Sequence, residues 1–240
     1  MELLFQSESM KKKKTLRPKH IAADMTTRLG RKRAQREMLW GDHGFLRIKF
    51  SNLHSISPEM WRSNQPSPRQ IRAHQQQRGI KTIINLRGVS TRGYYLLEKE
   101  TCAELGIKLI DYQVFSRDTP DRETVLGVRP LFEEIAYPAL MHCKSGADRA
   151  GLMSVLYRLA REGAPLAIAT DQLSLRYLHI KQGKTGMLDA FFAAAGAAGV
   201  VSADDFFSWI ENEYDRIKVK ADYLAATGRQ LELDRLLGRE

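Results

Sequence analysis

The chain has 240 residues, of which 43% are apolar, and its formal net charge is +10. This size suits one catalytic domain with extensions or two small domains, and the apolar content is ordinary for a globular protein. No stretch approaches the roughly 20 apolar residues of a membrane span. The short apolar start at residues 3–5 lacks the preceding basic residues of a signal peptide. We therefore expect a cytoplasmic protein.

The cysteine and histidine content argues against two kinds of site. Two cysteines, Cys102 and Cys143, are too few for a disulfide framework and fit a reducing compartment. The six histidines are scattered, and none shows the paired spacing of metal ligands. We expect no metal and no cofactor.

Most of the positive charge lies near the N-terminus. Residues 1–50 hold 13 Lys/Arg and 5 Asp/Glu (+8), and the remaining 190 residues hold 25 and 23 (+2). A basic run over residues 11–19 precedes a predicted helix that carries Arg28, Arg31, Lys32, Arg33 and Arg36. Both a solvated tail and contact between residues 11–36 and an anionic membrane fit this arm. Nucleic acid is disfavoured, since no aromatic residue interleaves with the basic ones before Trp40.

From Ile48 onward, strand-like and helix-like segments alternate. Ser67-Pro68 is a typical start of a helix, and Gly79 a typical end. Strands are predicted over 60–63, 81–86, 107–114 and 138–142. Helices are predicted over 68–78, 94–105, 119–136, 151–161, 166–178, 186–195 and 204–217, with a charged helical tail after residue 221. The alternation predicts an α/β fold, with a central, mostly parallel sheet flanked by helices and a helical C-terminal extension.

Residues 139–151 combine an apolar strand, a tight turn and the start of a helix. Gly146 permits the turn, so backbone N–H groups are expected to form an anion nest at the helix N-terminus. Arg149 follows Cys143 by six positions, and its planar fork can hold two phosphate oxygens. The positive field favours a Cys143 thiolate, which would act as the nucleophile. The residues expected to bind phosphate are Lys144, Ser145, Gly146, Ala147, Asp148 and Arg149.

His142 and Cys143, followed by five further residues and Arg149, resemble the signature of the protein tyrosine and dual-specificity phosphatases. Residues 61–66 and 81–88 resemble the small bacterial dual-specificity-like branch, and the resemblance covers about residues 48–195. It implies the protein tyrosine phosphatase fold and a metal-free mechanism in which Cys143 forms a cysteinyl-phosphate that water hydrolyses. Loop amides and Arg149 would stabilise the equatorial oxygens. His142 would support the loop and hold Cys143 in place.

The resemblance also implies an aspartic acid that protonates the leaving group, on the loop after the strand that precedes the signature strand. Asp118 is the first choice, because Asp121 suits the first turn of the next helix. Asp148 is the alternative acid, since an acidic residue before the loop arginine resembles phosphatases that act on inositol lipids. Ala150 stands where the family usually has Ser or Thr, so hydrolysis of the intermediate is expected to be slow unless another group helps.

These features predict a basic arm over residues 1–45, a catalytic domain over 46–200 and a helical extension over 201–240. The expected function is hydrolysis of phosphomonoesters, on a phosphoprotein or on a lipid or sugar phosphate. The alternative is a phosphatase of lipid A or inositol lipids, peripheral on the inner face of the membrane. A non-catalytic phosphate-binding module is disfavoured, because it would usually have lost Cys143 or Arg149, and both are present.

Overall fold

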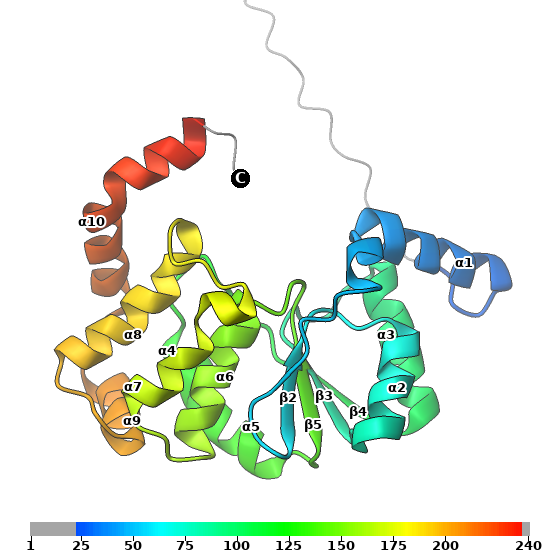
Figure 1. The fold of residues 1–240 in the computed structure, drawn as a ribbon, viewed down its shortest axis with the longest axis horizontal. Helices are drawn as coiled ribbons and strands as arrows, with labels where there is room; N and C mark the ends of the chain where they lie inside the picture. Colours follow the sequence, from blue (N-terminus) through cyan, green and yellow to red (C-terminus); the bar gives the residue numbers. More distant parts are fainter. Residues whose placement is uncertain (1–22, 237–240) are drawn as a thin grey trace, which may run out of the picture.

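A computed structural model of the chain describes residues 23–236, with a five-stranded sheet at its centre (Figure 1). The strand order is β1-β2-β5-β3-β4; β1 runs antiparallel to β2, and the other neighbours are parallel. The strands are β1 (His54–Ser55), β2 (Met60–Ser63), β3 (Thr82–Asn85), β4 (Lys108–Asp111) and β5 (Ala139–His142). The predicted α/β fold with a mostly parallel sheet is confirmed.

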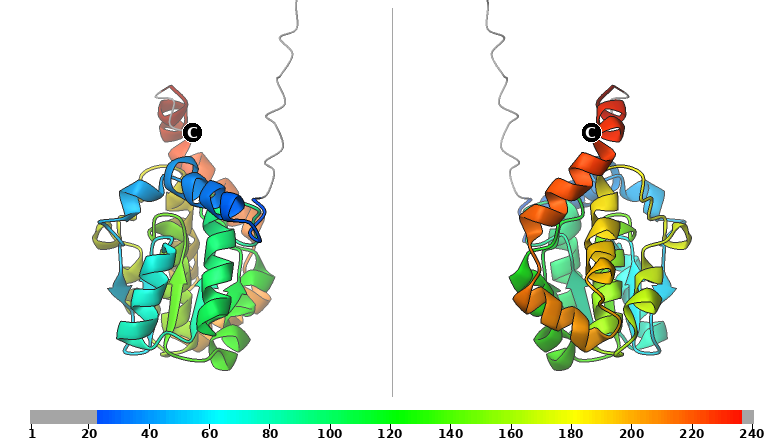
Figure 2. Two further views of the ribbon diagram at one scale, coloured as in Figure 1. Left: turned by 90° about the vertical axis from the view of Figure 1, so that its right-hand side faces the viewer. Right: turned by 90° about the vertical axis from the view of Figure 1, so that its left-hand side faces the viewer.

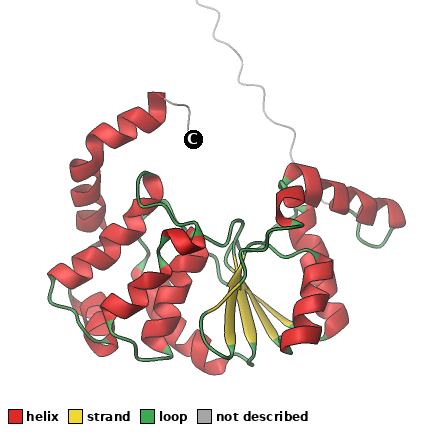
Figure 3. Ribbon diagram, in the orientation of Figure 1, coloured by secondary structure: helices red, strands yellow, loops and turns green. Residues whose placement is uncertain are grey.

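Helices cover both faces of the sheet, and Figure 3 shows the strands lying between them. On one face lie α2 (Pro68–Arg78) and α3 (Gly93–Leu105). On the other face lie α4 (Arg122–Leu126), α5 (Val128–Glu134) and α6 (Asp148–Ala160), with α7 (Leu166–Ala169), α8 (Met187–Ala197) and α9 (Ala203–Asn212) outside them. The last helix, α10 (Arg216–Leu236), rises beyond the body of the molecule (Figure 1).

The core lies on both sides of the sheet, because alternate residues of a strand point to opposite faces. Ile83 and Leu140 pack with Ile71 of α2, whereas the next residues, Ile84 and Met141, belong to the larger cluster that includes α6. The carboxyl ends of β2 and β3 are level with that of β5, with which both strands pair. The carboxyl end of β4 is level with that of its neighbour β3. Loops that follow these strands therefore meet at one edge, where ligands of α/β proteins usually bind.

Three predicted helices differ from the structure. The segment 119–136 forms two short helices, because Pro130 has no N–H to donate to the carbonyl four residues earlier. The segment 166–178 gives only α7 followed by 3₁₀ turns, because the backbone is extended at Ser174; the Gln172 carbonyl accepts a hydrogen bond from Arg62. The segment 204–217 breaks between α9 and α10, where Tyr214 is buried and packs on Trp209.

The described part of the predicted arm packs against α3. It contains α1 (Arg28–Arg36), a π-helical turn (Glu37–Gly41) and a 3₁₀ turn (Gly44–Arg47). Ala34 and Met38 pack with Tyr94 and Tyr95, and Figure 2 (left) shows α1 lying across the end of α3. The basic side chains of α1 stay exposed. The basic run over residues 11–19 lies outside the described residues, and the boundary at residue 45 stays a prediction.

Candidate active site

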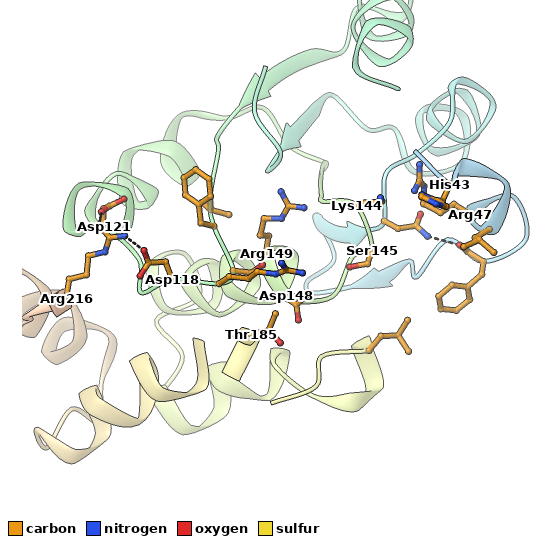
Figure 4. Close-up of a pocket in the computed structure, with 18 residues that line it drawn as sticks. His43, Arg47, Asp118, Asp121, Lys144, Ser145, Asp148, Arg149, Thr185 and Arg216 are labelled. Carbon is orange, nitrogen blue, oxygen red and sulfur yellow. Dashed lines mark hydrogen bonds and ion pairs between the residues drawn. The ribbon is translucent and has the colours of Figure 1, made fainter. Parts of the chain in front are cut away.

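A pocket of about 930 Å³ opens at the carboxyl edge of the sheet (Figure 4). The loop between β5 and α6, here called the phosphate loop (residues 143–149), contributes Lys144, Ser145, Asp148 and Arg149 to its lining. The loop at residues 115–121, here called the acid loop, contributes the polar residues Ser116, Arg117, Asp118 and Asp121. The remaining polar lining comes from other elements: His43, Arg47, Asn64, Thr185 and Arg216. Most of the predicted site residues therefore meet around one pocket.

Gly146 makes the sharp turn of the phosphate loop. Its φ is +76°, and a Cβ at this position would lie 2.7 Å from the backbone nitrogen of Asn64 and from the carbonyl carbon of Ser63. No side chain fits such a space without moving the β2 end. The Gly146 N–H points back at Cys143 and donates to its Sγ at 3.2 Å. Cys143 itself is buried, directly after β5.

The four carbonyl groups of residues 144–147 accept hydrogen bonds from groups outside the loop. The Gln65 N–H donates to the Lys144 carbonyl at 3.3 Å, and Asn52 Nδ2 donates to the Ser145 carbonyl at 3.0 Å. Arg62 Nη2 donates to the next two carbonyls, at 2.9 and 2.8 Å. In a trans peptide the N–H points opposite to the carbonyl. The N–H groups of residues 145–148 therefore face the inside of the loop and form an anion nest next to the N-terminus of α6.

Arg62 is the main support of this arrangement. Its side chain is fully buried, lies 4.3 Å from the ring centre of Tyr177, and also donates through Nη1 to the carbonyl and side chain of Gln172. Burial lowers the pKa of Arg62 to about 10, and the negative charges near it, that of Cys143 first, work in the opposite direction. The guanidinium therefore keeps its charge at neutral pH, beneath the loop and close to Cys143.

His142, at the end of β5, is buried and lies against a carboxylate of α3. Its Nε2 is 2.7 Å from Glu98 Oε1 of α3, and both side chains are fully buried. The other Glu98 oxygen accepts a hydrogen bond from Gln65 Nε2 at 3.0 Å. His142 thus contacts α3, and its role in holding Cys143 in place stays a prediction.

This contact continues as a chain of polar groups, here called the Asp42 network. Gln65 Oε1 accepts from Arg87 Nη1 at 2.9 Å, and Arg87 also donates to both carboxylate oxygens of Asp42, at 2.9 and 2.7 Å. Asp42 accepts from Arg47 Nη2 at 2.7 Å, and the Lys144 Nζ lies 3.8 Å from it. Arg87, two residues after β3, belongs to this network. The N-terminal segment is thereby joined to the phosphate loop.

Asp118, the predicted acid, lies at the pocket and is held by α10. Its carboxylate contacts Arg216 Nη2 at 2.9 Å and Lys220 Nζ at 3.0 Å, and it accepts the N–H of Thr119. Burial would raise the pKa of Asp118, but these bonds and charges together hold it below its ordinary value. Asp121 also pairs with Arg216, as Figure 4 shows.

Asp148, the alternative acid, lies in a different charge environment. Its Oδ1 is 2.8 Å from Nδ1 of His179, and the other ring nitrogen is 2.8 Å from Asp189 Oδ2. Burial alone would lower the pKa of His179, but hydrogen bonds to the two carboxylates raise it to about 9. At neutral pH an imidazolium therefore bridges the phosphate loop and α8.

The structure adds supporting residues that the sequence did not point to: Asp42, Asn52, Arg62, Gln65, Glu98 and His179. Arg62 and Gln65 fall inside the stretch that resembles the phosphatases, and that was their only signal. The second cysteine lies away from the pocket: Cys102 is buried in α3, and burial, together with Glu98, raises its pKa to about 12. Within residues 23–236, no group of His, Cys, Asp and Glu side chains is arranged to hold a metal ion.

Comparison with known proteins agrees with this geometry. Residues 51–187, more than half of the chain, match the family described as "DSP-PTPase phosphatase fused to NAD+ Kinase". "Dual specificity protein phosphatase TpbA" from two Pseudomonas aeruginosa strains, UCBPP-PA14 and PAO1, is 25% identical over 123 residues, which are 51% of this chain and 53% of TpbA. The chain thus spans about half the length of the curated relatives it matches.

Solved structures show the same fold. The crystal structure of P. aeruginosa TpbA superimposes with a TM-score of 0.52 at 21% identity, over 68% of this chain and 92% of that one. A TpbA variant in complex with pTyr gives 0.52 at 20% identity, over 67% and 91%. Together with the family match, which includes the phosphate loop, these findings confirm the resemblance, and the chain belongs to the DSP-PTPase family of phosphatases.

Proposed function

We propose that the chain hydrolyses phosphomonoesters in two steps, with Cys143 as the nucleophile. The observation that carries this proposal is the phosphate loop, in which four outward carbonyls leave the N–H groups of residues 145–148 facing inward. Such a nest suits three phosphate oxygens and stabilises charge in the transition state without rearrangement. Arg149, at the pocket beside it, supplies two further donors.

In the first step, Cys143 Sγ attacks phosphorus and forms the S–P bond while the bond to the leaving oxygen breaks. The leaving oxygen lies opposite Sγ in an in-line displacement and takes a proton from an acid. The acid loop lines the pocket and is separate from the phosphate loop, so an acid on it suits the leaving oxygen, which lies opposite Sγ. We therefore keep Asp118 as the proposed acid; it has to part from Arg216 and Lys220 before it can carry a proton.

In the second step, water attacks phosphorus, the S–P bond breaks, and inorganic phosphate leaves. The side chain of Ala150 is buried and has no hydroxyl to assist the departing thiolate. Asp148 lies in the phosphate loop with a bridging imidazolium behind it, and it is the second candidate for proton transfer in either step. The Gly146 N–H, which donates to Sγ, supports the thiolate as it leaves.

The substrate proposal has two branches. The relative TpbA is named a dual-specificity protein phosphatase and has a structure with pTyr, which favours a phosphoprotein here. The exposed basic side chains of α1 favour the second branch, a phosphorylated lipid or glycolipid at an anionic membrane. No helix within residues 23–236 has the length and apolar character needed to cross a bilayer, so this branch requires peripheral binding.

The decisive experiment is to trap the intermediate. The intact protein is mixed with para-nitrophenyl phosphate, quenched in acid and digested, and the peptide that contains Cys143 is examined by mass spectrometry. We expect a phosphate adduct on Cys143 and release of inorganic phosphate, inhibited by vanadate and unaffected by EDTA. Turnover without a cysteine adduct, or turnover that EDTA abolishes, would contradict the mechanism. A panel of phosphopeptides, phospholipids, lipid A phosphates and inositol phosphates then separates the substrate branches.

A further inference from the structure

Three segments around the mouth of the pocket expose large apolar side chains. Residues 40–50, 115–117 and 175–184 are here called the apolar rim. Four rim side chains both line the pocket and are 40% exposed or more: Leu46, Phe50, Phe115 and Leu178. Next to them, further rim side chains are exposed without lining the pocket: Trp40 (65%), Phe45 (40%), Ile48 (65%), Leu175 (74%) and Ile180 (53%). Single exposed apolar residues are normal, but a group that surrounds one opening marks an interaction site.

The exposed charges on the apolar rim are all positive. Its exposed basic residues are Lys49, Arg117, Arg176, Lys181 and Lys184. The only acidic residue within these three described segments is Asp42, which is buried and paired with Arg47 and Arg87. The rim therefore presents apolar and cationic groups together, with no exposed carboxylate among them.

This combination fits the interface of an anionic lipid bilayer. Lys and Arg near the surface of such a bilayer gain from its negative potential, while Trp, Phe and Leu side chains enter the headgroup and acyl boundary. Trp40 packs against Phe45 with tilted rings whose centres are 5.3 Å apart, and Trp has the apolar body and polar tip that suit a membrane interface. In Figure 1, the segments near residues 40–50 (blue) and 175–184 (yellow) lie at the same end of the molecule, beyond the carboxyl ends of the strands.

We propose that the apolar rim inserts into the interfacial layer of an anionic lipid bilayer and seats the mouth of the pocket against the headgroups. This contact differs from an electrostatic role of residues 11–36, because it is made by the walls of the pocket and includes apolar insertion. The binding stands independently of the proposed hydrolysis. Its consequence, that the substrate is a phosphate displayed at the bilayer surface, rests on the proposed function.

The test measures binding of the intact protein to vesicles of phosphatidylglycerol and phosphatidylcholine at physiological salt. The test variant is Trp40→Ser/Phe45→Ser/Ile48→Ser, which changes rim residues that do not line the pocket. The matched control is Ile168→Ser/Val201→Ser, whose side chains are 49% and 67% exposed and lie near α7 and α9. We expect the rim variant to partition at least about tenfold more weakly, because apolar insertion contributes to affinity, and the control to bind like the wild type.

A second readout places the rim in the lipid. Of the three tryptophans, Trp40 is the exposed one, whereas Trp61 is half-buried and Trp209 is 6% exposed. Brominated lipids should quench Trp40 when the protein binds vesicles. The conservative variant Trp40→Phe should keep the binding and lose most of the quenching. Activity on para-nitrophenyl phosphate without vesicles should be unchanged in the rim variant and in the control.

Three results would overturn the inference: wild-type protein that does not bind these vesicles, a rim variant that binds as well as the wild type, or bound protein without Trp40 quenching. Should the wild type instead self-associate in solution, and the rim variant remain monomeric, the rim is a protein interface. Vesicle binding by rim contact in a protein that hydrolyses no phosphomonoester would leave the inference standing and refute the proposed function.

Discussion

The phosphate loop and the acid loop face the same pocket but are held in opposite ways. The carbonyls of the phosphate loop are bound by Arg62, which is fully buried, and by Asn52 and Gln65, which are 3% and 2% exposed. The acid loop is held by ion pairs of Asp118 with Arg216 and Lys220, whose side chains are 31%, 41% and 44% exposed. Hydrogen bonds to buried groups are costly to lose, whereas exposed ion pairs contribute little.

The difference separates two tasks. A phosphate nest acts best when its donors are fixed before the substrate arrives, because no free energy is then spent on reordering them. An acid has to change protonation state and approach the leaving group, which weak contacts permit. We infer that the phosphate loop is rigid and that the acid loop exchanges between the observed position and one closer to the substrate.

The largest expected effect comes from a variant that removes the nucleophile and leaves both loops in place. Cys143→Ser should lower turnover of para-nitrophenyl phosphate by at least about 10³-fold, since a serine hydroxyl does not ionise at this position. The variant should keep its circular dichroism spectrum and its melting temperature within a few degrees. Substantial activity in a folded Cys143→Ser protein would contradict the assignment of the nucleophile.

Breaking the support of the phosphate loop is the next test. Arg62→Met leaves the carbonyls of Gly146 and Gln172 without their Arg62 donor, while the Ala147 carbonyl keeps the Gly151 N–H. It should lower the free energy of unfolding by about 2–5 kcal/mol, together with turnover. The matched control is Arg72→Met, which loses an exposed ion pair with Glu104 and should cost less than about 1 kcal/mol. Denaturant titrations measure both.

If Arg62→Met does not fold, Asn52→Ala provides a milder break. It removes the hydrogen bonds of the Asn52 side chain to the carbonyls of Ser145 and Tyr177 and to His54, and should cost about 1–3 kcal/mol, with a measurable drop in kcat/KM. Unchanged kinetics in folded variants of both residues would show that the loop keeps its shape without these donors.

The two candidate acids are separated by their leaving groups. Asp118→Asn should slow hydrolysis of alkyl phosphates by about 10²-fold or more and that of activated aryl phosphates much less, because only poor leaving groups need the proton. Asp148→Asn is the paired variant, measured with the same substrates. If Asp148→Asn alone shows the leaving-group dependence, Asp148 is the acid and the acid loop has another role.

The smallest expected effect comes from weakening the contacts that hold the acid loop. Arg216→Met/Lys220→Met removes the cations that hold Asp118, so the pKa of Asp118 should rise toward the ordinary carboxyl value of about 3.9. A larger fraction is then protonated at each pH, and the alkaline limb of kcat/KM for alkyl phosphates should move to higher pH. A profile that does not move would show that Asp118 takes no part in proton transfer.

The same double variant should change how the stability of the protein depends on pH. In the wild type, the lowered pKa of Asp118 contributes stability that is complete above the ordinary carboxyl pKa and is lost as the pH falls through the lowered value. The double variant should therefore lose less stability in acid than the wild type. Because the pair is exposed, the difference at neutral pH should be below about 1 kcal/mol.

The sequence predicted those parts of the fold that local signals determine. Ser67, Pro68 and Gly79 gave the correct start and end of α2, where Ser67 and Gln70 form a capping box and Gly79 has a φ of +65°. The sheet followed from the alternation of elements. The single helix predicted over 119–136 is wrong because Pro130, itself a local signal, interrupts it. The one over 166–178 is wrong because the backbone is extended at Ser174, where the neighbouring Gln172 binds Arg62, 110 positions away in the chain.

For the site, the sequence indicated the residues on the phosphate loop and not those that support it. Cys143, Gly146 and Arg149 lie within one short segment, so their spacing can be read directly. Asp42 and His179 contact the site from segments that carry no motif, and their partners are fixed only by the fold. Charged residues inside a protein look like surface residues in a sequence, since burial and pairing are tertiary properties.

The Asp42 network has a consequence for thermodynamic linkage. Asp42 lies in the N-terminal segment that packs on α3, and it pairs with Arg87 and Arg47 and lies near Lys144 of the phosphate loop. An oxyanion bound in that loop competes with Asp42 for the Lys144 charge, so occupancy of the pocket and docking of the N-terminal segment are energetically coupled, and the coupling is reciprocal. A fragment that begins at residue 46 lacks Asp42 and would leave Arg47 and Arg87 without their carboxylate partner. Its affinity for phosphate should therefore differ from that of the intact chain.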